Sequence, residues 1–167
     1  MKLAICYFSA TGRTERLAKA IAAGALEQNP QWDVRCLPIG EVDKAHPENV
    51  EFVNGAEGVL VGSPDYYAAE SWQMKQWLDT CPCRLAGKLA GVFATANFAV
   101  GGPGVAMEHM LTHLLVQGCM VYSGGGAYGQ PFIHLGPISL RDHEEDGDGL
   151  GRLFGQRFAA QLARIAR

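Results

Sequence analysis

Three hydroxyl side chains and a glycine stand close together near the start of the chain, in the segment Ser9-Ala10-Thr11-Gly12-Arg13-Thr14. An apolar run, residues 3–8, precedes this segment, and a helical pattern, residues 15–26, follows it. The N-terminus of a helix offers free backbone N–H groups and the positive end of the helix dipole to an anion. The hydroxyls add donors, and glycine lets the backbone approach a ligand without a Cβ. We therefore expect a phosphate site here; the alternative is a simple helix cap.

Two later segments also follow predicted strands. Residues 62–71 read Gly-Ser-Pro-Asp-Tyr-Tyr-Ala-Ala-Glu-Ser, and residues 95–104 read Thr-Ala-Asn-Phe-Ala-Val-Gly-Gly-Pro-Gly. Their aromatic side chains and glycine-rich backbone offer the flat contacts and hydrogen bonds that a planar ring system needs. The dinucleotide motif G-x-G-x-x-G is absent after the first strand, and no G-x-x-x-x-G-K-[ST] sequence occurs. The three segments together predict a binding site for a mononucleotide with one terminal phosphate.

Strands and helices must alternate to bring these segments to one place. Apolar runs predict strands at residues 2–8, 33–38, 58–62, 91–96 and 120–123, and amphipathic patterns predict helices at residues 14–27, 47–56, 71–79, 104–117 and 149–165. The nearly continuous apolar character of several strands indicates burial on both faces. This alternation predicts one α/β domain over residues 1–167, with a doubly wound parallel sheet whose ligands bind beyond the carboxyl ends of the strands.

Composition excludes several classes of function. A net charge of −3 over 167 residues gives no electrostatic footprint for nucleic acid or an anionic membrane. No apolar run reaches the roughly 18–20 residues that span a bilayer. The five cysteines are an odd number with scattered spacing, which favours a reducing compartment without disulfides. We expect a cytoplasmic protein.

The pattern Ser9-x-Thr11-Gly12-x-Thr14 resembles the phosphate loop of the flavodoxin-like FMN proteins. Residues 62–66 and the run Gln73-Met74-Lys75-Gln76-Trp77-Leu78-Asp79 resemble the second FMN loop and third helix of the NAD(P)H:quinone oxidoreductase branch. The resemblance covers nearly the whole chain. It implies a three-layer α/β/α sandwich with a five-stranded parallel sheet in the order 2-1-3-4-5. The third loop departs from that branch, because Ala96-Asn97-Phe98-Ala99 replaces its glycine-rich run.

The resemblance also implies roles for individual residues. The FMN phosphate would contact Ser9, Thr11, Gly12, Arg13 and Thr14. The isoalloxazine would be bordered by Pro64, Asp65, Tyr66 and Tyr67, and its pyrimidine side by Thr95, Ala96, Asn97, Phe98, Gly101 and Gly102. Several alternatives stay open at this stage. Either tyrosine could stack on the ring, Phe98 could cover the ring or pack beneath its loop, and Asp65 is more typical of a turn residue than of an acid–base catalyst.

Two classes of function fit such a site. One is an FMN-dependent oxidoreductase that takes hydride from NAD(P)H and reduces a quinone or similar small acceptor. No catalytic residue is assigned for it; Tyr66, Tyr67 and His134 are the candidates for proton delivery. The other is a flavodoxin-type carrier that passes electrons between partner proteins. Such carriers usually present a strongly acidic face for docking, and a net charge of −3 is small for that task. A flavin-free interaction module is a third possibility, and a homodimer is possible in each case.

The remaining polar residues predict little chemistry. His109 and His113 are spaced i, i+4 but lack the carboxylate of a zinc motif, so we expect no metal. Cys81-Pro82-Cys83 is too short for a C-x-x-C redox pair and favours a structural loop, with sensitivity to oxidation as the alternative. Residues 142–148 form an acidic run that we expect to be a solvated loop, with Asp146 or Asp148 capping the last helix.

Overall fold

A twisted parallel sheet forms the centre of the computed structural model, which describes residues 1–40 and 46–166. Its main strands are β1 (Lys2–Tyr7), β2 (Asp33–Pro38), β3 (Gly58–Tyr66), β5 (Leu89–Ala96) and β6 (Met120–Val121). They lie in the order β2-β1-β3-β5-β6, with all neighbours parallel. The predicted α/β fold and strand order 2-1-3-4-5 are confirmed.

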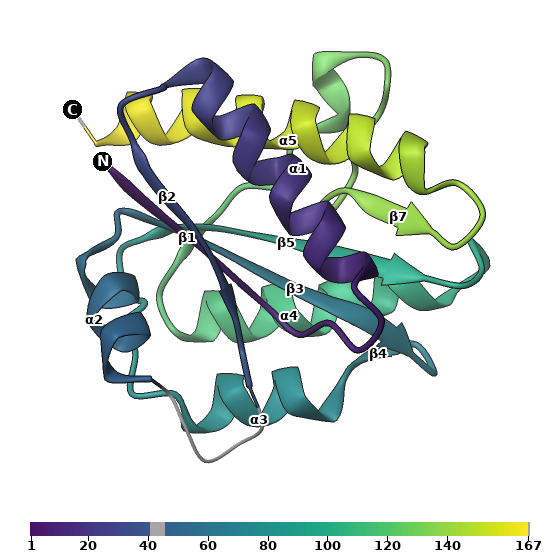
Figure 1. Cartoon of the computed structure of the whole chain (residues 1–167), viewed down its shortest axis with the longest axis horizontal. Helices are drawn as coiled ribbons and strands as arrows, with labels where there is room; N and C mark the ends of the chain where they lie inside the picture. Colours follow the sequence, from purple (N-terminus) through teal and green to yellow (C-terminus); the bar gives the residue numbers. More distant parts are fainter. Residues whose placement is uncertain (41–45, 167) are drawn as a thin grey trace.

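Helices cover both faces of the sheet (Figure 1). On one face lie α1 (Arg13–Gln28) and α5 (Glu144–Ile165), and on the other lie α2 (Pro47–Gly55), α3 (Trp72–Thr80) and α4 (Gly102–Val116). Side chains alternate along each strand, so Leu3 and Ile5 pack toward α1 and α5, whereas Ala4 and Cys6 pack toward the other layer. The sheet is therefore buried on both faces, as its apolar runs predicted. None of the helices in the described part of the chain is long and apolar enough to cross a membrane.

The segment predicted as a loop after residue 62 contains a β-hairpin. Strand β3 continues to Tyr66, and β4 (Ala69–Glu70) returns antiparallel to it, with Asp65 opposite Glu70 and Tyr66 opposite Ala69. Only two residues connect the strands. The sequence did not predict that β3 extends beyond residue 62, because polar residues and a proline such as Pro64 are typical of loops.

The fifth predicted strand is interrupted. Only Met120 and Val121 pair with the start of β5, and the pairing resumes with β7 (Ile138–Leu140), which lies parallel to Ala94, Thr95 and Ala96. Residues 122–137 leave the sheet between the two pieces and include a short 3₁₀ helix, η1 (Gly126–Tyr128). The strand predicted over residues 120–123 is present but shorter, because a glycine-rich segment follows it and a separate three-residue strand continues this edge of the sheet.

Most of the acidic run, residues 144–148, forms the beginning of α5 and not a loop. This helix begins at Glu144, five residues before the predicted start. Its N-cap residue is His143, and no side chain caps it, so the predicted capping role of Asp146 or Asp148 is wrong. Acidic side chains in the first turn of a helix interact favourably with the positive end of the helix dipole. Arg16 of α1 also pairs with Glu144 at 2.9 Å and with Asp148 at 2.7 Å.

Glycines allow α1 and α5 to pack against each other at close range. A Cβ on Gly24 would collide with the carbonyl oxygen of Arg152, and a Cβ on Gly155 would collide with that of Ile21. A Cβ on Gly151 would lie 2.7 Å from the side chain of Leu17. The backbones of the two helices therefore meet directly along the second half of α1.

Candidate functional site

The loop between β1 and α1 has the geometry of an anion site. Gly12 has φ +87°, a left-handed conformation that favours glycine, and nothing lies within 4 Å of the position its Cβ would take. Helix α1 begins at the next residue. Within the described part of the chain, the backbone N–H groups of residues 11–14 donate to no acceptor. Open space, exposed Thr11 and free N–H groups at a helix N-terminus fit a phosphate group.

Ser9 already supports this helix terminus. Its hydroxyl oxygen accepts a hydrogen bond from the backbone N–H of Glu15 at 3.2 Å. The hydroxyl proton remains available to a second acceptor, such as a phosphate oxygen. Burial of Tyr7, at the end of β1, raises the pKa of its hydroxyl to about 12, so this neighbouring group stays neutral at physiological pH.

Thr14 and Arg13 connect the phosphate loop to the segment after β5. The buried hydroxyls of Thr14 and Thr95 lie 2.9 Å apart. The Arg13 guanidinium donates to the side-chain oxygen of Asn97 at 2.8 Å and to the carbonyl of Ala96 at 3.4 Å. Arg13 is half-buried. The resemblance implies phosphate contacts for both residues, and in the structure both also join the phosphate loop to the β5–α4 loop.

The turn between β3 and β4 presents tyrosine side chains in an unusual backbone conformation. Tyr67 has φ +55° and Ala68 has φ +64°, although neither is a glycine. The Asp65 carboxylate accepts a hydrogen bond from the N–H of Ala68 at 2.9 Å, which identifies Asp65 as a turn residue. The side chain of Tyr67 is fully exposed, and that of Tyr66 is 41% exposed.

The β5–α4 loop lies against this turn. Gly102, the first residue of α4, approaches the Asp65 carboxylate so closely that a Cβ would overlap it. Gly101 has φ +86°. Phe98 and Val100 are 77% and 92% exposed, so Phe98 does not pack beneath its loop. Through these contacts the structure brings the three predicted loops together at the carboxyl edge of the sheet, with an exposed apolar rim made of Tyr66, Tyr67, Phe98 and Val100.

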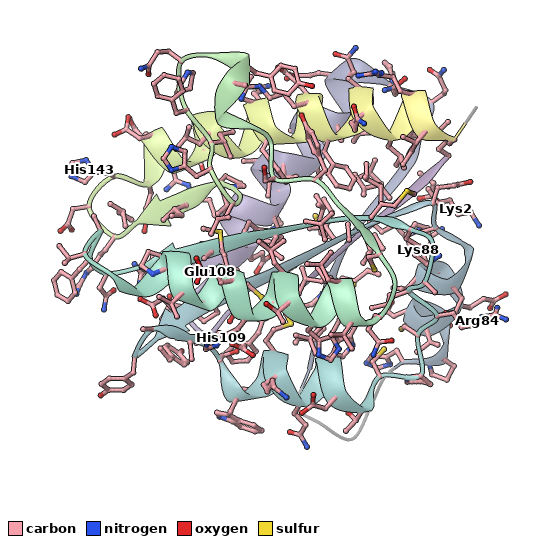
Figure 2. The ribbon with its side chains drawn as sticks, turned by 180° about the vertical axis from the view of Figure 1, so that it is seen from behind. Lys2, Arg84, Lys88, Glu108, His109 and His143 are labelled. Atoms are coloured by element: carbon pink, nitrogen blue, oxygen red, sulfur yellow. The ribbon has the colours of Figure 1, made fainter. Side chains whose placement is uncertain are left out.

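Two polar pairs that support the site were not predicted from the sequence. The Ser63 hydroxyl oxygen is buried and accepts a hydrogen bond from the N–H of Ser71 at 2.8 Å. Ser71 in turn caps α3 by accepting from the N–H of Met74, a role that its position just before a helix could have indicated. The second pair joins buried Glu70 of β4 to Nδ1 of His109 at 3.1 Å. Figure 2 labels His109, which lies on α4.

His134 is not brought together with the tyrosines. It lies in the segment between β6 and β7, where it lines a groove of about 500 Å³ with Met107 and Phe132. Tyr66 and Tyr67 line a different groove, beside Trp72 and His109. The structure therefore offers no support for His134 as a proton donor at the apolar rim.

Comparisons with known proteins agree with this geometry. No protein-family model matches the chain. A flavodoxin from Clostridium saccharobutylicum is 40% identical over 166 residues, covering 99% of both chains, and an NAD(P)H dehydrogenase (quinone) from Archaeoglobus fulgidus is 25% identical over 198 residues, covering 98% of both.

Solved structures share the fold. A flavodoxin, WrbA-like protein from Agrobacterium tumefaciens has a TM-score of 0.78 at 20% identity, and a flavodoxin from Fusobacterium nucleatum bound to flavin mononucleotide has a TM-score of 0.67 at 14% identity. Each comparison covers 98% of both chains. The close sequence relative, the common fold and the three joined loops lead to one conclusion: the chain belongs to the flavodoxin-like family.

Proposed function

We propose that this protein binds FMN at the carboxyl edge of the sheet and acts as a flavodoxin-type electron carrier. The observation that carries the proposal is the joining of an open phosphate loop to two aromatic loops. The 40% identical flavodoxin supports it, because chain and relative match over 99% of both lengths. FMN, when bound, supplies a centre that accepts and releases electrons one or two at a time.

The residues divide into three sets of contacts. Ser9, Thr11 and the N–H groups at the start of α1 would hold the phosphate. Tyr66 or Tyr67 would border one side of the ring, and Asn97 and Phe98 would border another. The Arg13 guanidinium holds the loop that carries Asn97, so it would fix the distance between the phosphate and ring sites. The exposed apolar rim would remain at the surface, where a partner can reach the flavin.

NAD(P)H-driven reduction of a quinone is the second candidate. It is favoured by the exposed apolar rim, which suits a small hydrophobic acceptor, and by the more distant NAD(P)H dehydrogenase (quinone) relative. That alignment spans 198 positions against a chain of 167 residues, so it contains gaps in this chain. The carrier therefore has the stronger support.

An anaerobic titration of the FMN-loaded protein separates the two functions. For a carrier, we expect reduction by dithionite in two spectrally distinct one-electron steps and no steady oxidation of NADH or NADPH. Sustained oxidation of either nucleotide with a benzoquinone would overturn the carrier and support the enzyme. Failure of the purified protein to bind added FMN would overturn both.

Thr11 provides a direct test of the phosphate site. Replacing it by leucine removes a hydroxyl donor and places an apolar group beside the phosphate. A hydrogen bond to a charged group contributes about 1.5–3 kcal/mol, so Thr11→Leu should raise the Kd for FMN by about tenfold or more. Quenching of flavin fluorescence measures this. The matched control is Thr112→Leu on the exposed side of α4, which should leave the Kd unchanged. An unaltered Kd in Thr11→Leu would contradict the assignment.

A further inference from the structure

A short hairpin carries both tyrosines of the apolar rim. Strand β4 has only two residues, and the turn that joins it to β3 places Tyr67 and Ala68 in left-handed backbone conformations. A two-stranded hairpin is only marginally stable by itself in water. Contacts with the rest of the molecule must therefore determine where the turn lies.

Helix α4 holds this hairpin at two points. At the start of the helix, Gly102 packs against the carboxylate of Asp65 on β3. About two helical turns further along, the Nδ1–H of His109 donates to the carboxylate of Glu70 on β4 at 3.1 Å. Asp65 and Glu70 lie opposite each other in the hairpin. The second contact uses histidine, the side chain that ordinarily changes its charge between about pH 5 and pH 8.

The buried charge of this pair belongs to Glu70. Its side chain is 5% exposed, whereas the His109 ring is 52% exposed and lines a groove of about 790 Å³ with Tyr66 and Tyr67. A buried carboxylate needs a positive partner or several hydrogen-bond donors. Among the residues that the structure describes, the His109 ring is the one donor to this carboxylate. A protonated His109 forms an ion pair with it, and a neutral His109 leaves it with a single neutral hydrogen bond.

Other titratable groups surround the pair. They come from the hairpin, from α3 and from α4: Asp65, Tyr66, Tyr67, Lys75, Asp79 and His113. Lys75 pairs with Asp79, so these two charges cancel. The Asp65 carboxylate already accepts the N–H of Ala68. His113 lies one turn beyond His109 on α4, so it is the neighbour whose charge has to be tested separately.

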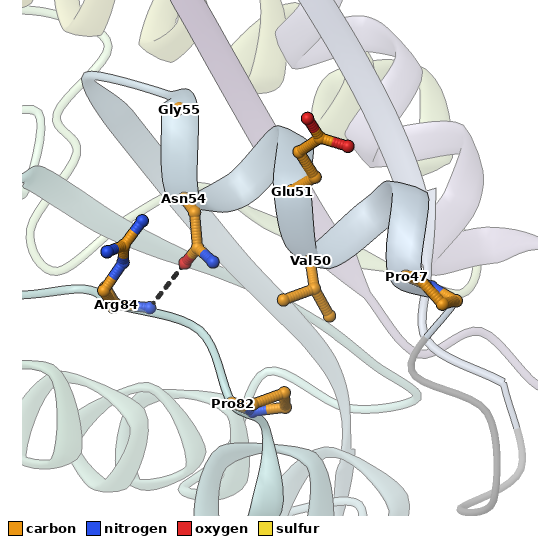
Figure 3. Close-up of a pocket in the computed structure, with 7 residues that line it drawn as sticks. All are labelled: Pro47, Val50, Glu51, Asn54, Gly55, Pro82 and Arg84. Atoms are coloured by element: carbon orange, nitrogen blue, oxygen red, sulfur yellow. Dashed lines mark hydrogen bonds between the residues drawn. The ribbon is translucent and has the colours of Figure 1, made fainter.

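A second groove shows how charged residues lie when they need no partner. This groove of about 570 Å³ runs between α2 and the segment after α3, and Glu51 and Arg84 are among the residues that line it (Figure 3). Both residues are exposed, so water solvates their charges. Loss of such an exposed charge has little effect on a folded protein. Glu51 is therefore a matched control for Glu70.

We propose that Glu70 and His109 are positioning residues, and that the charge of His109 determines how firmly the Tyr66–Tyr67 turn is held beside bound FMN. This inference rests on the proposed function, in which one of these tyrosines borders the flavin. Protonation of His109 strengthens the contact between α4 and β4 and holds the turn in place. Deprotonation weakens the contact, so FMN has to order the turn when it binds, and its affinity falls.

Nuclear magnetic resonance of the full-length protein without FMN tests the coupling directly. The His109 ring and the backbone amides of Tyr67 and Ala68 are followed from pH 5.5 to pH 8.5. We expect both amides to shift with the midpoint of the His109 ring. Most of this shift should be lost in Glu70→Gln, which keeps the shape of the side chain without its charge. Amides that do not follow the His109 ring in the wild type would overturn the proposal, whether or not the protein binds FMN.

The pH profile of FMN affinity tests the effect on the flavin site. Quenching of flavin fluorescence gives the Kd at pH 5.5 and at pH 8.5. Between these values the Kd of the wild type should rise by about fivefold more than that of Glu70→Gln or His109→Gln, the difference between a charged and a neutral hydrogen bond. Proteins are compared at the same pH, because a phosphate monoester itself changes charge near about pH 6.

Two controls identify the groups responsible. Glu51→Gln removes an exposed carboxylate, and His113→Gln removes the neighbouring histidine; both should keep the wild-type profile. A wild-type profile in Glu70→Gln, or the loss of that profile in His113→Gln, would contradict the assignment to Glu70 and His109. Absence of FMN binding at every pH would instead overturn the proposed function, and the amide shifts would still decide whether the pair controls the turn.

Discussion

Thr14 and Thr95 are the clearest example of what single residues contribute at this site. Their hydroxyls are buried and lie 2.9 Å apart, so each satisfies the other. Thr14→Val should cost about 1–3 kcal/mol of unfolding free energy, because it leaves a buried hydroxyl without its partner. The double variant Thr14→Val/Thr95→Val should recover most of that loss. Urea unfolding of the single and double variants measures both. A double variant whose cost equals the sum of the single costs would show that the hydroxyls do not interact.

Because of Tyr7, the free energy of unfolding should depend on pH in the alkaline range. Burial raises the pKa of its hydroxyl from 10.0 to about 12 in the folded state. The unfolded chain therefore releases this proton first, so the contribution is complete below pH 10 and is lost as pH rises to about 12. Over this range the wild type should lose up to about 3 kcal/mol more than Tyr7→Phe. Denaturant titrations at pH 9 and pH 12 give the difference. Equal losses in the two proteins would contradict the assignment to Tyr7.

For single residues, the sequence predicted which loops lie together but not which atoms each side chain contacts. The turn that contains Ser9, Thr11 and Gly12 was predictable, because it is a local connection between a strand and a helix. The contacts of Thr14 and Arg13 depend on residues more than 80 positions away. No local pattern encodes such a pairing, so the sequence does not predict these contacts.

Among the elements, the closely packed α1 and α5 give the sharpest prediction. Gly155→Ala should destabilise the protein by about 1–3 kcal/mol, because the new Cβ would collide with the carbonyl oxygen of Ile21. Alanine normally favours a helix over glycine by up to about 1 kcal/mol. Gly149→Ala, at an exposed position of the same helix with open space around it, should therefore stabilise the protein. Thermal unfolding distinguishes the two variants. A stabilising Gly155→Ala would show that the helices move apart at little cost.

Some helices and strands could be predicted from the sequence, and others could not. Long apolar runs predicted β1 and β5 well, because burial on both faces leaves a strong signal. Strand β7 has only three residues, and it becomes a strand because β5 lies beside it. The acidic start of α5 looked like a solvated loop, whereas the helix dipole and Arg16 stabilise it as a helix. Elements formed mainly by tertiary contacts were missed.

For the whole molecule, ligand binding should appear as stability. A ligand that binds only the folded state stabilises it by about 3 kcal/mol at a concentration 100 times its Kd. For a chain of this length, FMN at that concentration should raise the unfolding midpoint by about 5–10 °C. Riboflavin at the same concentration lacks the phosphate and should raise it much less. Differential scanning fluorimetry provides the measurement, and equal shifts for the two compounds would contradict a phosphate site in the β1–α1 loop.

The interruption between β6 and β7 affects how readily the sheet could pair with the sheet of another copy of the protein. An exposed sheet edge offers unpaired backbone groups to another chain, and a long, flat edge invites aggregation. On the β5 side, this edge consists of two residues in β6 and three in β7, separated by residues 122–137. Neither piece is long enough to template a stable intermolecular ladder. The break in the strand thus protects this edge of the sheet against edge-to-edge association, while the parallel sheet stays complete beside the β1–α1, β3–β4 and β5–α4 loops.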